Sequence, residues 1–251
     1  MKGRIMLIGI GPGGREHMTP RAVEAVKASE VIVGYGTYID LIKDLVGGKE
    51  VVARGMMEEV ERAKVAVERA LQGKRVGVIS SGDPGIYAMA PILFEYLREN
   101  AIELEVAVIP GITAANAAAA LLGSPLGHDF AVISLSDLLT PWETIEARVE
   151  AAARGDFVMV LYNPRSSRRR EPLERAVGII SRHRLPETPV GIVRSATRDG
   201  EAVIITTLEK LLGAEIDMLT VLIVGNSETY AHKGKMVTPR GYRVKYALRD
   251  G

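Results

Sequence analysis

Short apolar runs rich in β-branched residues alternate with amphipathic helical stretches along almost the whole chain, and this alternation limits what it can fold into. The runs are apolar on both faces, which suits strands that helices cover on each side. The pattern predicts an α/β fold with a largely parallel sheet. The predicted strands are residues 4–10, 30–34, 76–80, 104–109, 130–135, 157–162, 189–194, 202–206 and 220–224. The predicted helices are residues 20–28, 57–71, 91–99, 114–120, 142–153 and 171–183.

The two halves of the chain differ in how their predicted strands end. In the first half, glycine-rich turns follow the strands at residues 9–14, 80–84 and 110–113. In the second half, strands end on Tyr162-Asn163-Pro164 and on Ser195-Ala196-Thr197. This difference predicts two domains, residues 1–113 and 114–245.

Composition narrows the classes of protein that need to be considered. The net charge is +1, so the chain as a whole is not drawn to nucleic acid or to an anionic membrane. There is no cysteine, which excludes disulfides and thiolate metal sites and fits a cytoplasmic location. The apolar run near the start is too short for a signal peptide or a membrane span, so we expect a soluble protein. The four histidines show no metal-ligand spacing, and we expect no metal site.

The first glycine-rich loop has two interpretations from its residues. Gly9, Gly11 and Gly14 have the spacing G-x-G-x-x-G between a predicted strand and a helix, which is typical of a dinucleotide-binding loop. However, that fold needs an acid at the end of the second strand, and here Glu30 stands at its beginning. Pro12 also removes a backbone donor from the loop. We therefore favour a loop that approaches a ligand without a pyrophosphate over a dinucleotide site or a purely structural turn.

Three motifs in order resemble the tetrapyrrole methylase family, which uses S-adenosylmethionine. They are the glycine loop at residues 9–13, Ser-Gly-Asp-Pro-Gly-Ile-Tyr at 81–87 and Pro-Gly-Ile-Thr-Ala-Ala at 110–115. Segments 33–38, 127–137, 161–166 and 238–242 resemble the branch that methylates carbon 17 of precorrin-3B during ring contraction, giving precorrin-4. Many members carry an aspartate directly after the first loop. This chain has Gly14-Arg15 there, so that loop is not expected to act as an acid or base.

The resemblance implies two α/β domains, each on a mainly parallel or mixed sheet, with the cofactor in the cleft between them. It also implies a homodimer and a role in cobalamin biosynthesis. Carried over by position, the residues expected to bind S-adenosylmethionine are Pro12, Ser81, Gly82, Asp83, Ile86, Thr113, Ala114, Asn163, Ala196 and Gly225. For Asp83, capping of the following helix is the structural alternative to ligand binding.

A precorrin carries many carboxylates, so its binding site should be rich in arginine. Arg165, directly behind Asn163-Pro164, is the first candidate, and the arginine run at 168–170 is the second unless it is a solvated helix start. Arg194, Arg198 and Arg240 are weaker candidates. Tyr35 is expected to stack on the macrocycle or to pack at its rim.

Ring contraction needs proton transfers, and the segment at 127–137 offers groups for them. An imidazole is the side chain best suited to proton transfer near neutral pH, so His128 is the first choice for an acid or base, although a loop histidine is the plainer interpretation. Asp129 and Asp137 are further candidates, with Ser134 as a hydrogen-bonding residue toward the substrate.

Three other functions are compatible with parts of the sequence. A family member acting on another corrin carbon, on a diphthamide precursor or on ribosomal RNA is one. RNA would favour a basic, aromatic surface, but the charge is only +1 and 5% of the residues are aromatic. A nicotinamide oxidoreductase lacks its second-strand acid. A non-enzymatic cofactor sensor is the third.

Overall fold

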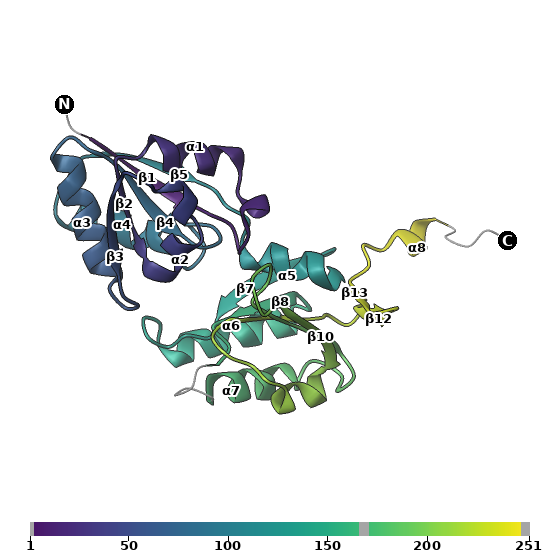
Figure 1. The fold of residues 1–251 in the computed structure, drawn as a ribbon. Helices are drawn as coiled ribbons and strands as arrows, with labels where there is room; N and C mark the ends of the chain where they lie inside the picture. The colour runs from purple at the N-terminus through teal and green to yellow at the C-terminus, as the bar shows by residue number, and fades with distance from the viewer. Residues whose placement is uncertain (1–2, 166–170, 247–251) are drawn as a thin grey trace. The chain divides into compact units, whose positions relative to one another are not determined.

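The computed structural model describes residues 3–165 and 171–246. The chain forms two compact units, Met1–Ala114 and Ala115–Gly251, and each contains a five-stranded sheet (Figure 1). The predicted α/β class is confirmed. The arginine run at residues 168–170 lies outside the described residues. Within them, no helix has both the length and the apolar character needed to cross a membrane.

The sheet of the first unit is entirely parallel, with the strand order β3-β2-β4-β1-β5. Helices α3 and α4 cover one face, against Ile5 and Leu7 of β1. Helices α1 and α2 cover the other face, against Met6 and Ile8. Successive residues of β1 are therefore buried on opposite faces, which is why these strands are apolar throughout. The elements are β1 Arg4–Gly9, α1 Pro20–Ala28, β2 Val31–Tyr35, α2 Gly36–Asp40, β3 Glu50–Arg54, α3 Glu59–Leu71, β4 Arg75–Ser80, α4 Met89–Glu99 and β5 Glu105–Ile109.

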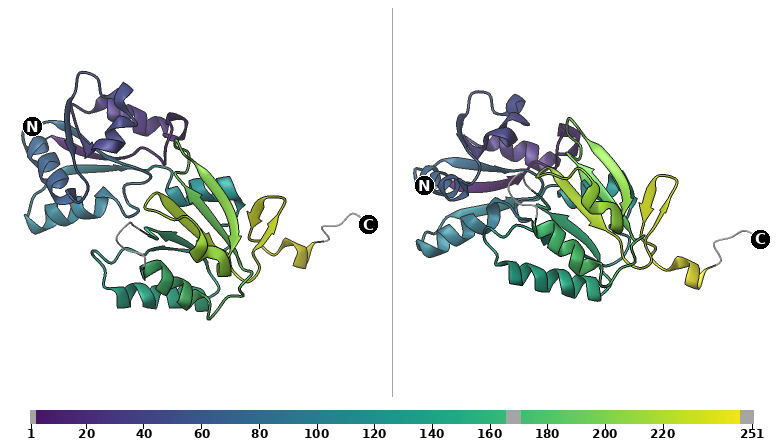
Figure 2. Two further views of the ribbon diagram at one scale, coloured as in Figure 1. Left: turned by 60° about the horizontal axis from the view of Figure 1, so that its bottom comes forward. Right: turned by 90° about the horizontal axis from the view of Figure 1, so that it is seen from below.

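The sheet of the second unit is mixed, with the strand order β10-β9-β11-β8-β7. Only β7 and β8 are parallel, and the other three pairs are antiparallel. Helices α6 and α7 pack on one face of this sheet (Figure 2). On the other face, Leu122 of α5 packs against Gly191. Because β8 and β9 are both antiparallel to β11, and β7 is parallel to β8, the strands β7, β8 and β9 all end at the edge where β10 and β11 begin. The elements are α5 Ala114–Leu122, β7 Phe130–Ser134, α6 Trp142–Arg154, β8 Val158–Tyr162, α7 Glu171–Ile180, β9 Pro189–Arg194, β10 Ala202–Thr207 and β11 Thr220–Val224.

A small three-stranded sheet, β12-β13-β6, completes the second unit. Its strands are β6 Gly123–Ser124, β12 Tyr230–His232 and β13 Lys235–Val237, and the short helix α8 covers Tyr242–Lys245. Lys233 and Gly234 both have positive φ and turn the chain between β12 and β13. Strands of two or three residues show no alternation to detect, so the sequence analysis missed them, along with the largely exposed edge strand β3.

Candidate functional site

The three glycine-rich loops meet at one edge of the first sheet. Strands β4, β1 and β5 are neighbours and parallel, so the loops that follow them leave from the same edge. Gly11 and Gly82 exchange two backbone hydrogen bonds, with N···O distances of 3.2 and 2.7 Å. The first two loops are therefore joined backbone to backbone, with no side chain between them.

Gly9 and Gly111 are needed for this close approach. A Cβ atom on Gly9 would lie 2.7 Å from both Gly82 O and Gly111 N, and one on Gly111 would collide with Gly82 O. Any side chain at either position would push the loops apart. The glycines at these two positions are thus required for the packing of the loops themselves, whatever ligand they bind.

Gly82 differs from these two glycines. Its φ is +61°, which favours glycine, but a Cβ atom there would meet nothing nearer than Thr113 Cα at 3.7 Å and Ala114 N at 3.8 Å. The side of Gly82 on which a Cβ atom would lie therefore faces the third loop at Thr113 and Ala114. The structure brings these three predicted cofactor residues together, at distances where a Cβ atom on Gly82 would make ordinary van der Waals contact with the third loop. This arrangement fits a ligand that is approached closely by backbone.

Asp83 holds the second and third loops together. Its Oδ1 accepts a hydrogen bond from Gly85 N at 2.8 Å, and its Oδ2 accepts one from Gly111 N at 3.1 Å. It does not cap the following helix, because α4 begins at Met89 after Ala88. Both carboxylate oxygens keep further acceptor capacity, so this bracing does not prevent contact with a ligand. Around it, Pro12 is buried, Ser81 is half-buried and Ile86 is 42% exposed.

Glu30 is the acid nearest to the second strand, and the structure places it away from this edge. It precedes β2, accepts a hydrogen bond from Arg75 N at 3.1 Å and lies near the charged groups of Arg75 and Lys74. The hydrogen bond from the Arg75 amide is the main reason that the pKa of Glu30 lies below its ordinary value. Because β2 itself ends in Tyr35, no acid stands where a dinucleotide ribose would need one.

In the second unit, β7 and β8 end side by side at a linked pair of polar residues. Asn163 Nδ2 donates to Ser134 Oγ at 3.0 Å, and the same Oγ accepts a second bond from Ser136 N at 3.2 Å. Asn163 has a φ of +52°, a conformation that asparagine tolerates better than most residues. A predicted cofactor residue and a predicted substrate residue are thus in direct contact.

Tyr162 is a site residue that the sequence analysis missed. Its hydroxyl accepts a hydrogen bond from Ala115 N at 2.8 Å and so satisfies a free amide at the start of α5. Both residues belong to the second unit. Tyr162 ends β8, so this bond ties the start of α5 to the edge that carries Asn163. The contact spans 47 residues of sequence, and no local pattern reveals it.

The loop that contains Ala196 lies on the same edge of the second sheet. Ser195 N donates to Leu219 O at 2.9 Å, which joins this loop to the start of β11. Ala196 is half-buried, and Arg165, after Asn163-Pro164, is also half-buried. Arg194 is engaged with Asp217, since its Nε lies 2.7 Å from Asp217 Oδ2. Asn163, Ala196 and Arg165 therefore share one edge.

His128, Asp129 and Gly225 lie at the opposite edge of this sheet from Asn163, Ala196 and Arg165. His128 and Asp129 precede β7, so a five-residue strand of about 16 Å separates them from the loop of Asp137. Gly225 follows β11, which runs antiparallel to β8 and β9, and its amide donates to Pro189 O at the start of β9. The strand directions therefore place His128 and Asp137 at opposite edges of the sheet, and they separate Gly225 from Asn163 and Ala196 in the same way.

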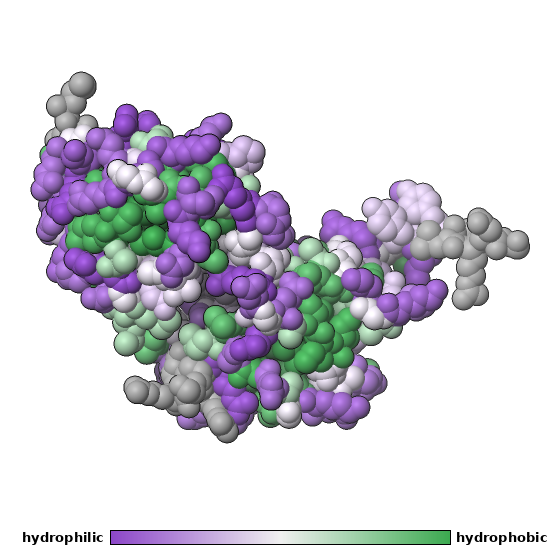
Figure 3. All heavy atoms as spheres, viewed as in Figure 1, coloured by the Kyte–Doolittle hydropathy of each residue, from purple (hydrophilic) through white to green (hydrophobic). Residues whose placement is uncertain are grey.

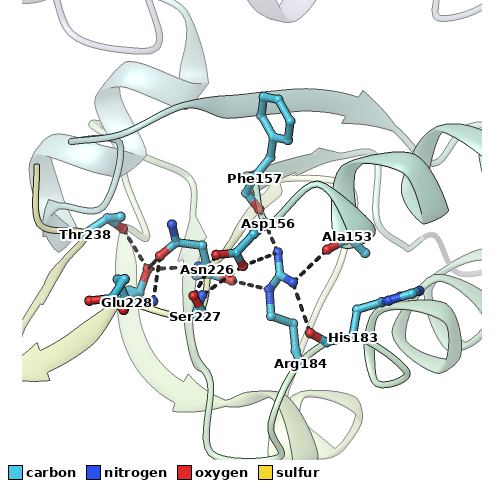
Figure 4. Close-up of polar contacts among 11 residues, drawn as sticks. Ala153, Asp156, Phe157, His183, Arg184, Asn226, Ser227, Glu228 and Thr238 are labelled. Carbon is cyan, nitrogen blue, oxygen red and sulfur yellow. Dashed lines mark hydrogen bonds and ion pairs between the residues drawn. The ribbon is translucent and has the colours of Figure 1, made fainter.

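The opposite edge is occupied by a structural network around Arg184 (Figure 4). The Arg184 side chain is 3% exposed and donates to the carbonyls of Ala153 at 2.7 Å and Phe157 at 3.1 Å, with Asp156 Oδ1 at 3.1 Å. Burial lowers the pKa of Arg184, and the charge of Asp156 opposes that shift. The Arg184 Nε also donates to Gly225 O at 3.3 Å. Gly225 is thus part of a packed support, and a Cβ atom on it would lie 2.6 Å from Thr229 Cβ.

Tyr35 and Asp137 are the two remaining residues predicted to act on the substrate. Tyr35 ends β2, beside β4, and its ring meets Tyr38 edge-on with centroids 5.1 Å apart. Asp137 is exposed, three residues beyond the end of β7. In the part of the chain that the structure describes, no three His, Asp or Glu side chains gather as they would around a metal ion.

Several known proteins are similar to this chain in sequence and in fold. The "Cobalt-factor III methyltransferase" of Priestia megaterium is 51% identical over 100% of this chain and 47% of its own length, so the chain spans about half of that protein. The "Probable cobalt-factor III C(17)-methyltransferase" of Salmonella typhimurium is 49% identical over 96% of this chain and 100% of its own length. The crystal structure of the methyltransferase CobJ has a TM-score of 0.88 at 39% identity, covering 94% of this chain and 100% of its own.

The sequence profile of the Tetrapyrrole (Corrin/Porphyrin) Methylases matches residues 4–212, which is most of the chain. The match includes the three glycine-rich loops and both sheet edges that carry the predicted site residues. It confirms the resemblance drawn from the motifs and removes the nicotinamide oxidoreductase. The chain belongs to the tetrapyrrole methylase family.

Proposed function

We propose that this chain transfers a methyl group from S-adenosylmethionine to carbon 17 of a precorrin-3B-type ring, with contraction of the ring to the precorrin-4 level. The observation that carries the proposal is the likeness to the Salmonella protein, which is 49% identical over its full length and is named "Probable cobalt-factor III C(17)-methyltransferase". That name and the Priestia name both specify cobalt-factor III, so we propose the cobalt-loaded form as the substrate.

The cofactor site that we propose lies at the carboxyl edge of the first sheet. Gly82 approaches Thr113 and Ala114 of the third loop, and Asp83 presents spare acceptor positions beside Gly85 and Gly111. Pro12, Ser81 and Ile86 complete this group. The family resemblance also assigns Asn163 and Ala196 to the cofactor. The bound cofactor supplies a methyl group that its sulfonium charge has already activated.

The contribution of the protein to such a displacement is mainly positioning. Holding a donor and an acceptor in line is worth about 7–11 kcal/mol of barrier, provided that the groups around them are themselves fixed. The Gly11–Gly82 bonds and the Asp83 brace fix the loops of the first unit. The Asn163–Ser134 bond does the same for the ends of β8 and β7.

The substrate brings carboxylates and a broad ring, and we propose separate partners for each. Arg165 offers a fork of donors to a carboxylate, directly after the Asn163 loop. Tyr35 offers an aromatic face at the end of β2. Ser134 Oγ accepts the bonds from Asn163 Nδ2 and Ser136 N, so its hydroxyl proton can be donated to the substrate. Asp137 is the remaining acid–base candidate on that edge.

We also propose that the enzyme acts as a cytoplasmic homodimer, as the family resemblance implies. The lack of cysteine supports an intracellular location. Light scattering coupled to gel filtration measures the mass directly, and the mass of a single chain would contradict the dimer.

The decisive experiment incubates the purified protein with S-adenosylmethionine and either the metal-free or the cobalt-loaded precursor. Mass spectrometry of the product should show the gain of one methyl group with the cobalt form. A gain only with the metal-free ring would show that the substrate is the metal-free form and not the cobalt-loaded one. No gain with either ring, despite tight binding of S-adenosylhomocysteine, would contradict the proposed reaction and favour a cofactor sensor.

A further inference from the structure

Tyr87 has a backbone conformation that is unfavourable for its residue type. Its φ is +51°, in the left-handed region where a bulky side chain is strained. In the loops after β1 and β4, the residues Gly11 and Gly82 also have positive φ, and both are glycines. A glycine at position 87 would remove the strain, so the retention of an aromatic ring points to a use for that ring.

The distribution of such residues supports a functional reason for the strain. Eight described residues other than glycine have positive φ, and four of them lie in the loops after β4, β8 and β9. These four are Tyr87, Asn163, Ser195 and Thr197. Strained backbone gathers at ligand-binding loops, where the surrounding structure holds it in place. Tyr87 is the one aromatic residue among the eight.

Hydrogen bonds on both sides hold Tyr87 in this conformation. Before it, Ile86 N donates to Asp83 O at 3.3 Å, and the Asp83 carboxylate holds Gly85. After it, Ala90 N donates to Pro84 O at 2.9 Å. The loop is thus fixed while Tyr87 itself remains 53% exposed. Green areas in Figure 3 mark apolar residues on the face of the molecule that it draws.

The edge of the first sheet is divided between two kinds of surface. Gly11, Gly82 and Gly111, in the loops after β1, β4 and β5, bring bare backbone to it, which suits a ligand that needs close approach. The strand β2, a neighbour of β4, ends in Tyr35, whose ring meets Tyr38, and Tyr87 lies farther along the loop after β4. Aromatic faces suit a broad, flat, unsaturated ring.

We propose that Tyr87 is a further substrate-binding residue whose ring packs on the face of the tetrapyrrole. This inference rests on the proposed function and extends it, because it assigns the strain at position 87 to recognition of the ring. The phenol hydroxyl is not essential to such packing, so phenylalanine should serve almost as well.

The test compares Tyr87→Gly and Tyr87→Phe with Met57→Gly, a matched control. Met57 is also non-glycine, has a φ of +65° and is 78% exposed, but it lies before α3, outside the loop of Tyr87. Three quantities are measured for each variant: the melting temperature, the affinity for S-adenosylhomocysteine by calorimetry, and the affinity for the cobalt-loaded tetrapyrrole by its visible absorbance.

Tyr87→Gly should keep S-adenosylhomocysteine affinity within about twofold and weaken tetrapyrrole binding by about tenfold or more. Tyr87→Phe and Met57→Gly should bind both ligands like wild type. Unchanged tetrapyrrole binding by folded Tyr87→Gly, or a parallel loss of cofactor affinity, would overturn this role alone. If wild type binds no tetrapyrrole, the proposed function fails and takes this role with it.

Discussion

Asn163 Nδ2 donates a hydrogen bond to Ser134 Oγ at 3.0 Å and so couples the ends of β8 and β7. Asn163 was expected to contact the cofactor and Ser134 the substrate. Their contact means that a change in either residue alters the position of the other. Because Ser134 Oγ also accepts the Ser136 amide, this hydroxyl organises the turn after β7 as well.

Replacing Ser134 with alanine should therefore lower both stability and rate. Loss of an acceptor that serves two donors costs about 1 kcal/mol or more of unfolding free energy, and misplacement of Asn163 should slow methyl transfer by about tenfold or more. Urea denaturation and single-turnover rates measure the two effects. Ser227→Ala is the control, since Ser227 Oγ donates to Asp156 Oδ2 at 2.6 Å on the opposite edge. A rate loss in both variants would show that the effect is not local.

Gly82 and Gly111 should respond differently to substitution by alanine. Gly82→Ala has room for its Cβ and should cost only about 1–2 kcal/mol for the left-handed backbone, while it fills the space facing Thr113. Its affinity for S-adenosylhomocysteine should fall by about tenfold or more. Gly111→Ala collides with backbone and should lose far more stability. Calorimetric titration beside thermal unfolding checks the contrast, and normal cofactor binding by Gly82→Ala would mean that its loop is only a turn.

His128 and Asp137 are separated by the length of β7, which gives a direct comparison of two candidate acid–base groups. Asp137→Asn should slow turnover by about tenfold or more, as expected for a lost proton-transfer group. His128→Ala should stay within about twofold of wild type, because His128 lies on the other edge of the sheet. The pH dependence of the rate in both variants is the measurement. Slow turnover of a normally folded His128→Ala variant would show that His128 takes part in the reaction.

Arg184 should be among the most sensitive positions for stability. Its side chain is 3% exposed, and Arg184→Met removes a charged donor from the Ala153 and Phe157 carbonyls and from the Asp156 carboxylate. Asp156 is 42% exposed and keeps Ser227 as a donor, so the main cost comes from the buried carbonyls and is about 1–3 kcal/mol. The control is Arg182→Met, whose pair with Glu150 is exposed and is worth about 0–1 kcal/mol. Equal midpoints in urea for the two variants would contradict the supporting role of Arg184.

The sequence predicts some parts of this structure well because they depend on local pattern. Runs buried on both faces identified the main strands, and glycines placed after strands identified the loops that meet at one edge. Parallel strands make that meeting predictable, since their carboxyl ends share an edge. In the second unit this reasoning fails for Gly225, because β11 runs antiparallel and ends on the other side.

Other features depend on contacts that no local pattern encodes. The bond between Tyr162 and Ala115 crosses 47 residues, and the Asp83 brace on Gly111 crosses 28. The burial of Arg184 is equally hidden, because an arginine after a helix usually lies in water. His128 was grouped with Asp137 because they are nine positions apart, but an extended strand turns that short separation into a long distance.

The pair of Arg194 and Asp217 predicts how acid affects the edge that carries Ala196. Partial burial favours the neutral form of Asp217, but hydrogen bonds from Arg194, Thr220 and the Leu219 amide outweigh it. They hold the pKa of this carboxyl below its ordinary value of 3.8. A depressed pKa in the folded state means that the stabilisation is complete above about pH 4. It is lost as the pH falls through the folded-state value.

Asp217→Asn should therefore be less stable than wild type by the same amount at pH 7 and pH 5, and the difference should shrink toward pH 3. The difference should be about 1 kcal/mol or less, because the Arg194 and Asp217 side chains are 45% and 43% exposed and salt and water screen them. Urea denaturation of both proteins at the three pH values measures it. A difference that grows on acidification would mean that the folded-state pKa is raised instead, and that burial of the carboxyl outweighs its hydrogen bonds.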